Sequence, residues 1–320
     1  MNRLLFQQRI DGWDSWGRVF QSTEAFAPLV RAVLRREDLP ADDPVQALTP
    51  GTNAVFLAGE TVVKLYAPEE SGVHDLDAAA LEDVALRRAA ACGLRVPRPL
   101  AVGIFDDRYR FSYLLTERLK GREAGPALRE TPAGERAAFA RMVRQNLDKL
   151  NVPYTGHWAA EFTGRAVQNA SAGQPRWKRC SARFLALRDG WLREAEPPGE
   201  TPVFLHGDVT GDNTWISPDG FPAFLDFGDA SMAPRPVEYA AVVADLFDWD
   251  PAMTAAFCGD QPADTFAREL LRGMLLHDFG EEFLRLAGRR LLGDDAAPFE
   301  RFEPLLAALT VLAQGISRPR

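Results

Sequence analysis

Apolar and polar positions follow two different periods along the chain, and each period predicts its own kind of element. Residues 23–37, TEAFAPLVRAVLRRE, carry apolar side chains at helical spacing after Thr23, which can cap a helix. From residue 46 to residue 119 the pattern changes to short β-prone runs, among them TVVKLY and RFSYLLTERL, separated by turn residues. One helical run, residues 74–93, interrupts these strands and closes on Gly93. This half of the chain predicts a sheet with one inserted helix.

Helical spacing prevails after residue 120. Helices are predicted at residues 131–151, with Thr131 as the cap, at residues 176–196, and in three runs between residue 236 and the C-terminus, one of them 266–288. Residues 155–175 have no clear period and predict a long irregular or substrate-facing segment. Three short strands, VFLH, NTWIS and PAFLDF, interrupt the helices, and PDG predicts a hairpin turn between the last two.

Composition narrows the class of protein. The chain has 320 residues, which favours two lobes or domains, and its net charge of −8 disfavours general binding to nucleic acid or anionic membranes. An acidic pocket for a cationic substrate is compatible with that charge. Three widely separated cysteines without CxxC spacing indicate neither a disulfide framework nor a zinc site. No apolar run approaches the ~18 to 20 residues that span a bilayer, and the N-terminus lacks signal-peptide features, so we expect a cytoplasmic protein.

The polar residues of the stretch 204–229, FLHGDVTGDNTWISPDGFPAFLDFGD, are framed by apolar strands. Asp208 and Asn213 lie five positions apart on a loop, and the predicted hairpin returns the chain so that Asn213 and Asp226 can meet. Their oxygens are ligands suited to Mg²⁺, and Asp208 would be placed to accept a proton from a hydroxyl nucleophile. These are the working parts of phosphoryl transfer. The alternative is ordinary loop polarity.

HGDVTGDN followed by LDFGD resembles the catalytic loop and metal-binding motif of the aminoglycoside phosphotransferase and choline kinase family, small-molecule relatives of the protein kinases. The resemblance covers about residues 46 to 286. It implies an α+β, protein-kinase-like bilobal fold, with a small antiparallel β lobe, a larger mainly helical lobe and the nucleotide between them. The implied division is an N-terminal helical extension over residues 1–45, a nucleotide-binding lobe over 46–119, and a helical lobe over 120–320 that carries the catalytic loop and substrate pocket.

The same resemblance assigns roles in the small lobe. Lys64, alone in a β-prone run, looks like the lysine that grips the nucleotide phosphates, and Glu82 resembles the glutamate that orients it. An edge-strand lysine with its head in water is the alternative. The loop over the phosphates would contain Gly51, Thr52 and Asn53, although the GxGxxG pattern of protein kinases is missing.

The run YLLTERLKG resembles the family's hinge between the two lobes, in which the main chain around Glu117 and Leu119 would meet the adenine edge. The alternative for this run is a buried edge strand. In the helical lobe the resemblance makes His206 a loop-organising residue. Glu238 occupies a place where relatives often carry an aspartate that braces the catalytic loop, and its longer side chain leaves that role open.

The predicted function follows from these roles. An enzyme of this kind would be a Mg²⁺-requiring kinase that moves the γ-phosphate of ATP or GTP to a hydroxyl of a small molecule, such as a cationic amine or an amino sugar. Asp208 would be the base, Asn213 and Asp226 the metal ligands. The alternative is a catalytically inactive nucleotide-binding regulatory or scaffold protein of the same fold. A protein kinase is disfavoured because only ASMAPRP separates Asp229 from the next helical run.

Overall fold

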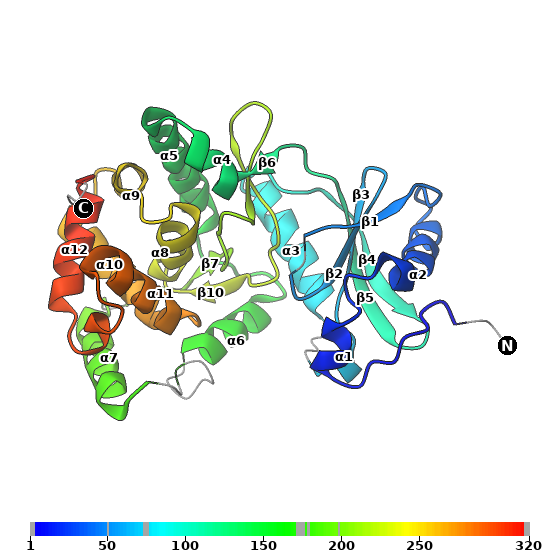
Figure 1. Ribbon diagram of the computed structural model, residues 1–320, viewed down its shortest axis with the longest axis horizontal. Coiled ribbons are helices and arrows are strands. Elements are labelled where there is room, and N and C mark those ends of the chain that lie inside the picture. The colour runs from blue at the N-terminus through cyan, green and yellow to red at the C-terminus, as the bar shows by residue number, and fades with distance from the viewer. Residues whose placement is uncertain are drawn as a thin grey trace. The chain divides into compact units, whose positions relative to one another are not determined.

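The protein is described by a computed structural model in which the chain divides into two compact units (Figure 1). The first consists of Met1–Ala91 with Val96–Lys120, and the second of Cys92–Arg95 with Gly121–Arg320. The structure describes residues 4–49, 51–72, 77–170, 177, 180–197 and 199–316, with residues 165–170 described by their main chain alone. The predicted division into segments 1–45, 46–119 and 120–320 stays a prediction.

A five-stranded sheet forms the centre of the first unit. Its strands are β1 (Val45–Ala47), β2 (Ala54–Ala58), β3 (Thr61–Leu65), β4 (Pro99–Asp106) and β5 (Arg110–Glu117), in the order β1-β2-β3-β5-β4. Every neighbouring pair is antiparallel. The inserted helix is α3 (Ala78–Ala91), it packs on β4 and β5, and it ends before Gly93, whose φ of +82° suits a helix C-terminus. The predicted small antiparallel β lobe is confirmed.

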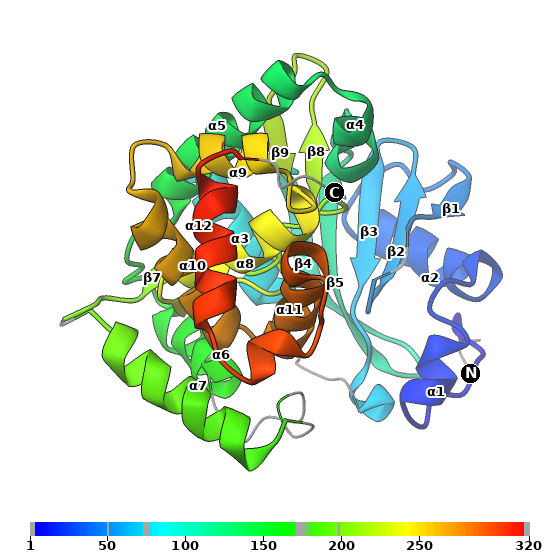
Figure 2. The same cartoon turned by 60° about the vertical axis from the view of Figure 1, so that its left-hand side comes forward.

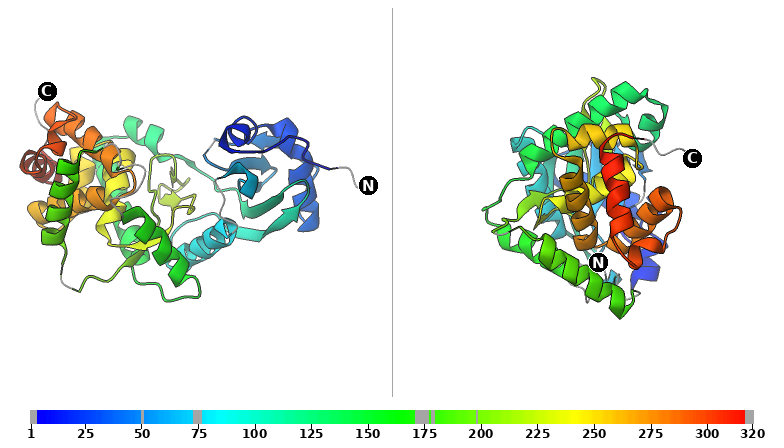
Figure 3. Two further views of the ribbon diagram at one scale, coloured as in Figure 1. Left: turned by 90° about the horizontal axis from the view of Figure 1, so that it is seen from below. Right: turned by 90° about the vertical axis from the view of Figure 1, so that its left-hand side faces the viewer.

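The N-terminal segment packs on this sheet. It contains α1 (Trp13–Gly17) and α2 (Thr23–Arg36), and the helices lie beside the strands in Figures 1 and 3. Phe26 and Leu29 of α2 share one buried core with Val63 and Leu65 of β3. Because successive strand residues point to opposite faces, Lys64 lies on the other face. The cap of α2 is Ser22, whose hydroxyl accepts the Ala25 N–H, and not the predicted Thr23, which is the first helical residue.

The second unit is mainly helical. Its α-helices are α4 (Ala124–Glu130), α5 (Ala133–Leu150), α6 (Ala159–Ala170), α7 (Ala182–Ala195), α8 (Pro236–Ala241), α9 (Pro251–Cys258), α10 (Ala263–Leu276), α11 (Gly280–Ala287) and α12 (Glu303–Ala313). A π-helical turn, η3 (Val242–Leu246), extends α8. Helices α10 and α12 run side by side in Figure 2 and pack together. The predicted helical lobe is confirmed.

The polar stretch over residues 204–229 is built on short strands between the helices. β7 (Val203–Leu205) pairs with β10 (Ser231–Ala233), while β8 (Thr214–Ile216) pairs with β9 (Pro222–Phe224) and with β6 (Arg122–Glu123). The β8–β9 pair is the predicted hairpin. Gly220 lies in its turn with a φ of +85°. The strand pattern missed β10, because its three residues stand alone between two loops.

Three predictions about the helical lobe are wrong in part. Residues 155–175 were predicted to be irregular, yet they contain α6, which buries Phe162 against Phe204 and Tyr154, so tertiary packing outweighs the weak local period. Residues 171–175 of this segment lie outside the described residues. Thr131 caps no helix start: its hydroxyl donates to the Ala127 carbonyl and ends α4.

The third of these predictions is the single helix over residues 266–288. This run is broken at His277–Phe279, where α10 ends and α11 begins. Nowhere in the described part of the chain does a helix combine the length and apolar character that crossing a membrane needs.

The N-terminal core leads to a prediction about stability. Phe26→Ala removes a fully buried ring that contacts Phe6, Trp16, Phe56 and Phe111, and we expect it to lower the free energy of unfolding of the first unit by about 3 to 5 kcal/mol. Urea unfolding measures the loss. Trp13→Ala is the control, since Trp13 is 48% exposed. Equal losses of unfolding free energy in the two variants would show that Phe26 adds nothing to the stability of the core.

Candidate functional site

A buried carboxylate lies beneath the loop that follows β7. Glu238 in α8 is 1% exposed, and its two oxygens accept the main-chain N–H groups of His206 at 2.8 Å and Gly207 at 3.0 Å. Burial raises the pKa of Glu238, and the two N–H donors oppose that rise. The longer side chain that left this role open thus reaches the loop directly.

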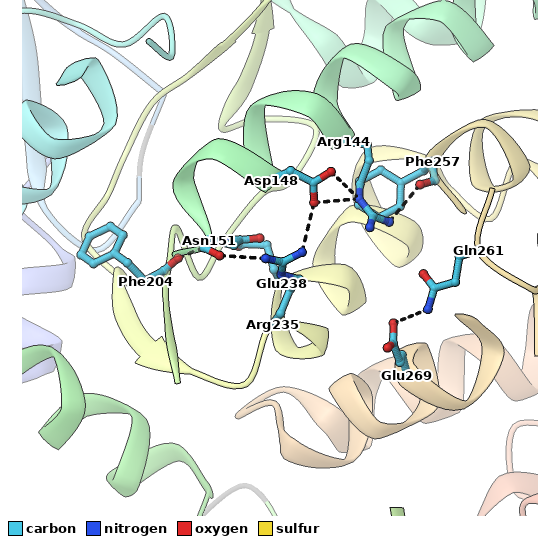
Figure 4. Close-up of polar contacts among 9 residues, drawn as sticks. All are labelled: Arg144, Asp148, Asn151, Phe204, Arg235, Glu238, Phe257, Gln261 and Glu269. Atoms are coloured by element: carbon cyan, nitrogen blue, oxygen red, sulfur yellow. Dashed lines mark hydrogen bonds and ion pairs between the residues drawn. The ribbon is translucent and has the colours of Figure 1, made fainter. Parts of the chain in front are cut away.

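Asn151, at the end of α5, completes the support of this loop (Figure 4). Its fully buried amide group donates to the Phe204 carbonyl at 3.0 Å and to Glu238 Oε2 at 3.1 Å. Arg235 then donates to the Asn151 carbonyl at 3.0 Å and to Asp148 at 3.3 Å. The network ties the loop to two helices, so its position depends on packing far from the loop itself.

His206 organises the loop from within. It is fully buried, its Nε2 lies 2.9 Å from the Leu225 carbonyl, and its Nδ1 lies 3.2 Å from the main-chain nitrogen of Asp208. A carbonyl only accepts and an amide N–H only donates, so the ring is the neutral Nε2–H tautomer. His206 therefore joins the Asp208 loop to the strand end that carries Asp226.

Asp208 and Asn213 meet directly. The amide nitrogen of Asn213 donates to Asp208 Oδ2 at 2.7 Å and to the Asp208 carbonyl at 3.2 Å. The carboxylate is thereby held in one orientation, and the Asn213 amide oxygen is left as the oxygen that would face a cation. Both residues are half-buried.

The β8–β9 hairpin returns the chain to Asn213. The Leu225 N–H donates to the Asn213 carbonyl at 2.8 Å, and Asp226 is the next residue. Asp226 is exposed and has a φ of +55°, a left-handed conformation that costs a non-glycine residue free energy and is often found at functional sites. Its Oδ1 accepts the Gly228 N–H at 3.2 Å, which stabilises the turn.

Close main-chain packing fixes the two ends of the loop. Gly207 has a φ of +89°, and a Cβ there would lie 2.2 Å from the Asp229 carbonyl oxygen. At the other end, the Gly211 N–H donates to Asp245 of the π-helical turn at 2.7 Å, and a Cβ on Gly211 would lie 2.9 Å from the Cα of Gly125. Two glycines thus let three segments approach each other.

Negative charge is concentrated around Asp208. Partial burial, and then the carboxylates of Asp229, Asp226, Asp245 and Glu238, raise the pKa of Asp208 to about 7. A divalent cation would neutralise this charge, and the Asn213 and Asp226 oxygens are of the type that Mg²⁺ prefers. Among the described residues no group of three His, Cys, Asp or Glu side chains could hold a metal ion. The oxygen donors of Asn213 and Asp226 fit Mg²⁺ by their chemistry, because this ion takes few protein ligands alongside phosphate oxygens and water.

Lys64 and Glu82 meet in the first unit. The Lys64 ammonium donates to Glu82 Oε2 at 2.7 Å, and the two side chains are 10% and 4% exposed. The Tyr66 hydroxyl donates to the same oxygen, and its ring centroid lies 5.3 Å from the Lys64 nitrogen. Lys64 is therefore not an edge-strand lysine with its head in water.

The other residues predicted for the first unit lie at its loops. Gly51 and Thr52 are exposed between β1 and β2, and the Asn53 side chain accepts the Ala67 N–H at 3.2 Å. Glu117 ends β5, where its N–H donates to the Arg98 carbonyl and its carboxylate pairs with the Arg98 guanidinium. Leu119 is half-buried beyond the strand. The roles of these residues stay predictions.

Comparison with known proteins identifies the family. A model of the family described as phosphotransferase enzymes matches residues 46–287. The chain belongs to the phosphotransferase enzyme family. The predicted family and the prediction of a small-molecule kinase that uses an alcohol group as acceptor are confirmed, and the matched residues include both HGDVTGDN and LDFGD.

Solved structures of this phosphotransferase type share the fold. The GDP complex of aminoglycoside 2'-phosphotransferase-IIIa is 17% identical, over 88% of this chain and 95% of that chain, with a TM-score of 0.57. A choline/ethanolamine kinase family protein from Mesorhizobium loti is 19% identical, over 88% and 98%, with a TM-score of 0.52. A thermostable mutant of APH(4)-Ia with ADP and hygromycin B is 16% identical, over 91% and 99%, with a TM-score of 0.55. The predicted protein-kinase-like fold is confirmed.

Sequence reasoning missed three residues of the phosphotransferase's candidate site. Tyr66 stands two positions after Lys64, directly beyond the end of β3, so the period of two of that strand already indicated one face for both. Asn151 gave no signal, since a polar residue at a predicted helix end is common. Asp245 gave no specific signal, since acidic residues are spread over the chain, yet it accepts the Gly211 N–H.

The Glu238 contacts lead to a prediction. In Glu238→Gln the oxygen would stay with His206 and Asn151, which share Oε2, and the NH₂ group would face the Gly207 N–H. We expect amide exchange of Gly207 to accelerate about tenfold or more, because the N–H loses its acceptor. Glu282→Gln, at an exposed position, is the control. Unchanged exchange at Gly207 would contradict the bracing role.

Proposed function

We propose that the protein is a Mg²⁺- and nucleotide-dependent phosphotransferase that moves the γ-phosphate of ATP or GTP to a hydroxyl of a small molecule. The observation that carries the proposal is the orientation of Asp208 by Asn213, at 2.7 Å, in a loop braced from below by Glu238. A carboxylate that only faces solvent needs no such support.

Asp208 acts on the acceptor. Its carboxylate accepts a hydrogen bond from the acceptor hydroxyl and takes the proton as the oxygen attacks the γ-phosphorus. The new bond joins the hydroxyl oxygen to phosphorus, the bond to the β-phosphate oxygen breaks, and the nucleoside diphosphate leaves. Asn213 holds Asp208 Oδ2, so the other carboxylate oxygen is directed at the acceptor.

Asn213 and Asp226 would hold Mg²⁺, which neutralises phosphate charge when bound. Lys64 binds the phosphates, and Glu82 and Tyr66 fix its ammonium. Gly51, Thr52 and Asn53 contact the phosphates from the β1–β2 loop, and the main chain at Glu117 and Leu119 binds the base.

The acceptor is proposed to be a cationic amine or an amino sugar. The carboxylates of Asp226, Asp229 and Asp245 act together on Asp208, and such a field attracts a positively charged acceptor. Solved relatives bind molecules of this kind, for example hygromycin B in APH(4)-Ia. A panel of aminoglycosides, choline-like amines and hydroxy amino acids, each with Mg-ATP or Mg-GTP, tests the proposal by the diphosphate released and the phosphate on the acceptor. Nucleotide binding without transfer to any acceptor would favour the inactive alternative.

Asp208→Asn tests the base. The amide cannot take a proton, so we expect turnover to fall by a factor of about 10² to 10⁴ while Mg-nucleotide affinity stays within about threefold. Initial rates and isothermal titration measure the two effects. Asp212→Asn, an exposed aspartate of the same loop, should retain turnover. Normal turnover in the Asp208 variant would remove Asp208 from the mechanism.

Asp226→Ala tests the metal ligand. Because a carboxylate ligand is lost, we expect nucleotide affinity in the presence of Mg²⁺ to fall about tenfold or more, and affinity in EDTA to change little. Titration of ATP or GTP with and without Mg²⁺ separates the two. Asp264→Ala, at an exposed helix start, is the control. A loss of the same size in EDTA would argue against a metal contact.

A further inference from the structure

The N-terminal segment, which lies outside the family match over residues 46–287, reaches the loop between β1 and β2. The indole N–H of Trp16 in α1 donates to the main-chain carbonyl of Thr52 at 3.0 Å. Thr52 belongs to the loop to which we assigned phosphate binding. A side chain that lies outside the matched residues thus touches the loop directly.

Trp16 is held rigidly. It is fully buried, and its ring centroid lies 6.0 Å from that of Phe20 and 5.8 Å from that of Phe26. The indole nitrogen can only donate, and a buried donor needs an acceptor, which the Thr52 carbonyl provides. The hydrogen bond therefore joins a fixed side chain to a peptide group of an exposed loop.

The segment that carries Trp16 is anchored to the sheet. Asp107, between β4 and β5, accepts the N–H groups of Leu5 at 2.9 Å and Phe6 at 2.8 Å. The Tyr109 hydroxyl accepts the Ile10 N–H at 2.7 Å. These bonds and the aromatic core hold α1 in place against the same sheet that carries the loop.

The loop itself is set by contacts from outside it. The hairpin is closed by the Leu48 N–H, which donates to the Val55 carbonyl at 2.9 Å. A Cβ on Gly51 would meet nothing within 4 Å, so close packing against this glycine does not set the loop. Trp16 holds the Thr52 carbonyl, and the Asn53 side chain accepts the Ala67 N–H.

We propose that Trp16 is a positioning residue for nucleotide binding. In a trans peptide the carbonyl and the following N–H point in opposite directions, so a Thr52 carbonyl turned toward the buried indole turns the Asn53 N–H the opposite way. An outward N–H at this place is a phosphate donor. The N-terminal segment thus replaces the orienting effect of a full glycine set. The inference rests on the proposed function of this loop.

Trp16→Phe tests the inference, with Trp13→Phe as a matched control on the same helix, where the side chain is 48% exposed. The phenylalanine keeps an aromatic ring and removes the N–H. We expect the Kd values for Mg-ATP and Mg-GTP to rise about three- to tenfold in Trp16→Phe, and to stay within about twofold in the control. With an accepted substrate, the KM for nucleotide should rise by the same factor while kcat and the KM for the acceptor stay within about twofold.

The thermal unfolding midpoint of Trp16→Phe, measured with and without Mg-nucleotide, distinguishes a role in positioning the loop from a role in stability alone. A purely structural role lowers the midpoint equally with and without Mg-nucleotide, whereas a positioning role also reduces the rise that nucleotide produces. If the wild-type protein binds Mg-nucleotide and Trp16→Phe binds it equally well, the inference is wrong and the proposed function stands. If the wild-type protein binds no nucleotide, the proposed function fails and the inference fails with it.

A measurement on the wild-type protein covers the case in which Trp16→Phe does not fold. The seven tryptophans give seven indole ¹⁵N–¹H signals, which Phe variants at the other six positions assign by elimination. Addition of Mg-ADP should shift the Trp16 signal and leave the Trp13 signal in place. A Trp16 signal that does not move at saturating Mg-ADP would overturn the inference.

Discussion

The carboxylate of Glu238 is the group on which the geometry of the loop between β7 and β8 depends. It is buried with two main-chain N–H groups and an asparagine amide as its donors, an arrangement that offsets part of the cost of removing the charge from water. The His206 ring then connects this loop to its surroundings: its Nδ1 accepts the Asp208 N–H, and its Nε2 donates to the Leu225 carbonyl, directly before Asp226. Asp208 and Asp226 are thus placed mainly by contacts to the main chain around them.

The first unit depends on a sheet that is covered on both faces. Val63 and Leu65 face the N-terminal core, while Lys64 between them faces Glu82 of α3. Because successive side chains of β3 point to opposite faces of the sheet, the Lys64–Glu82 pair lies on the face opposite the apolar core. Burial strengthens the Lys64–Glu82 attraction, and Tyr66 adds a hydrogen bond to the same carboxylate, so the ammonium has a defined position.

The sequence predicted the longer strands, the hairpin and the motif residues because each has a local signal. TVVKLY has β-prone residues, PDG sets the β8–β9 turn, and the spacing of Asp208, Asn213 and Asp226 is contained within one short stretch. The supporting contacts have no such signal. Asn151 and Glu238 are 87 positions apart, and their contact follows from the packing of α5 and α8. The same reason explains α6, which forms because Phe162 is buried between Tyr154 and Phe204.

The anchoring of the N-terminal segment has a consequence for how the chain folds. Leu5 and Phe6 are bonded to Asp107 across sequence separations of 102 and 101 residues. Contacts of such long range form late, since the intervening chain must first be closed into a loop. During synthesis, α2 leaves the ribosome long before β5, so the core that α2 shares with Phe111 and Leu115 of β5 stays incomplete until that strand has emerged. The core of the first unit is therefore complete only after both its beginning and its end have been synthesised.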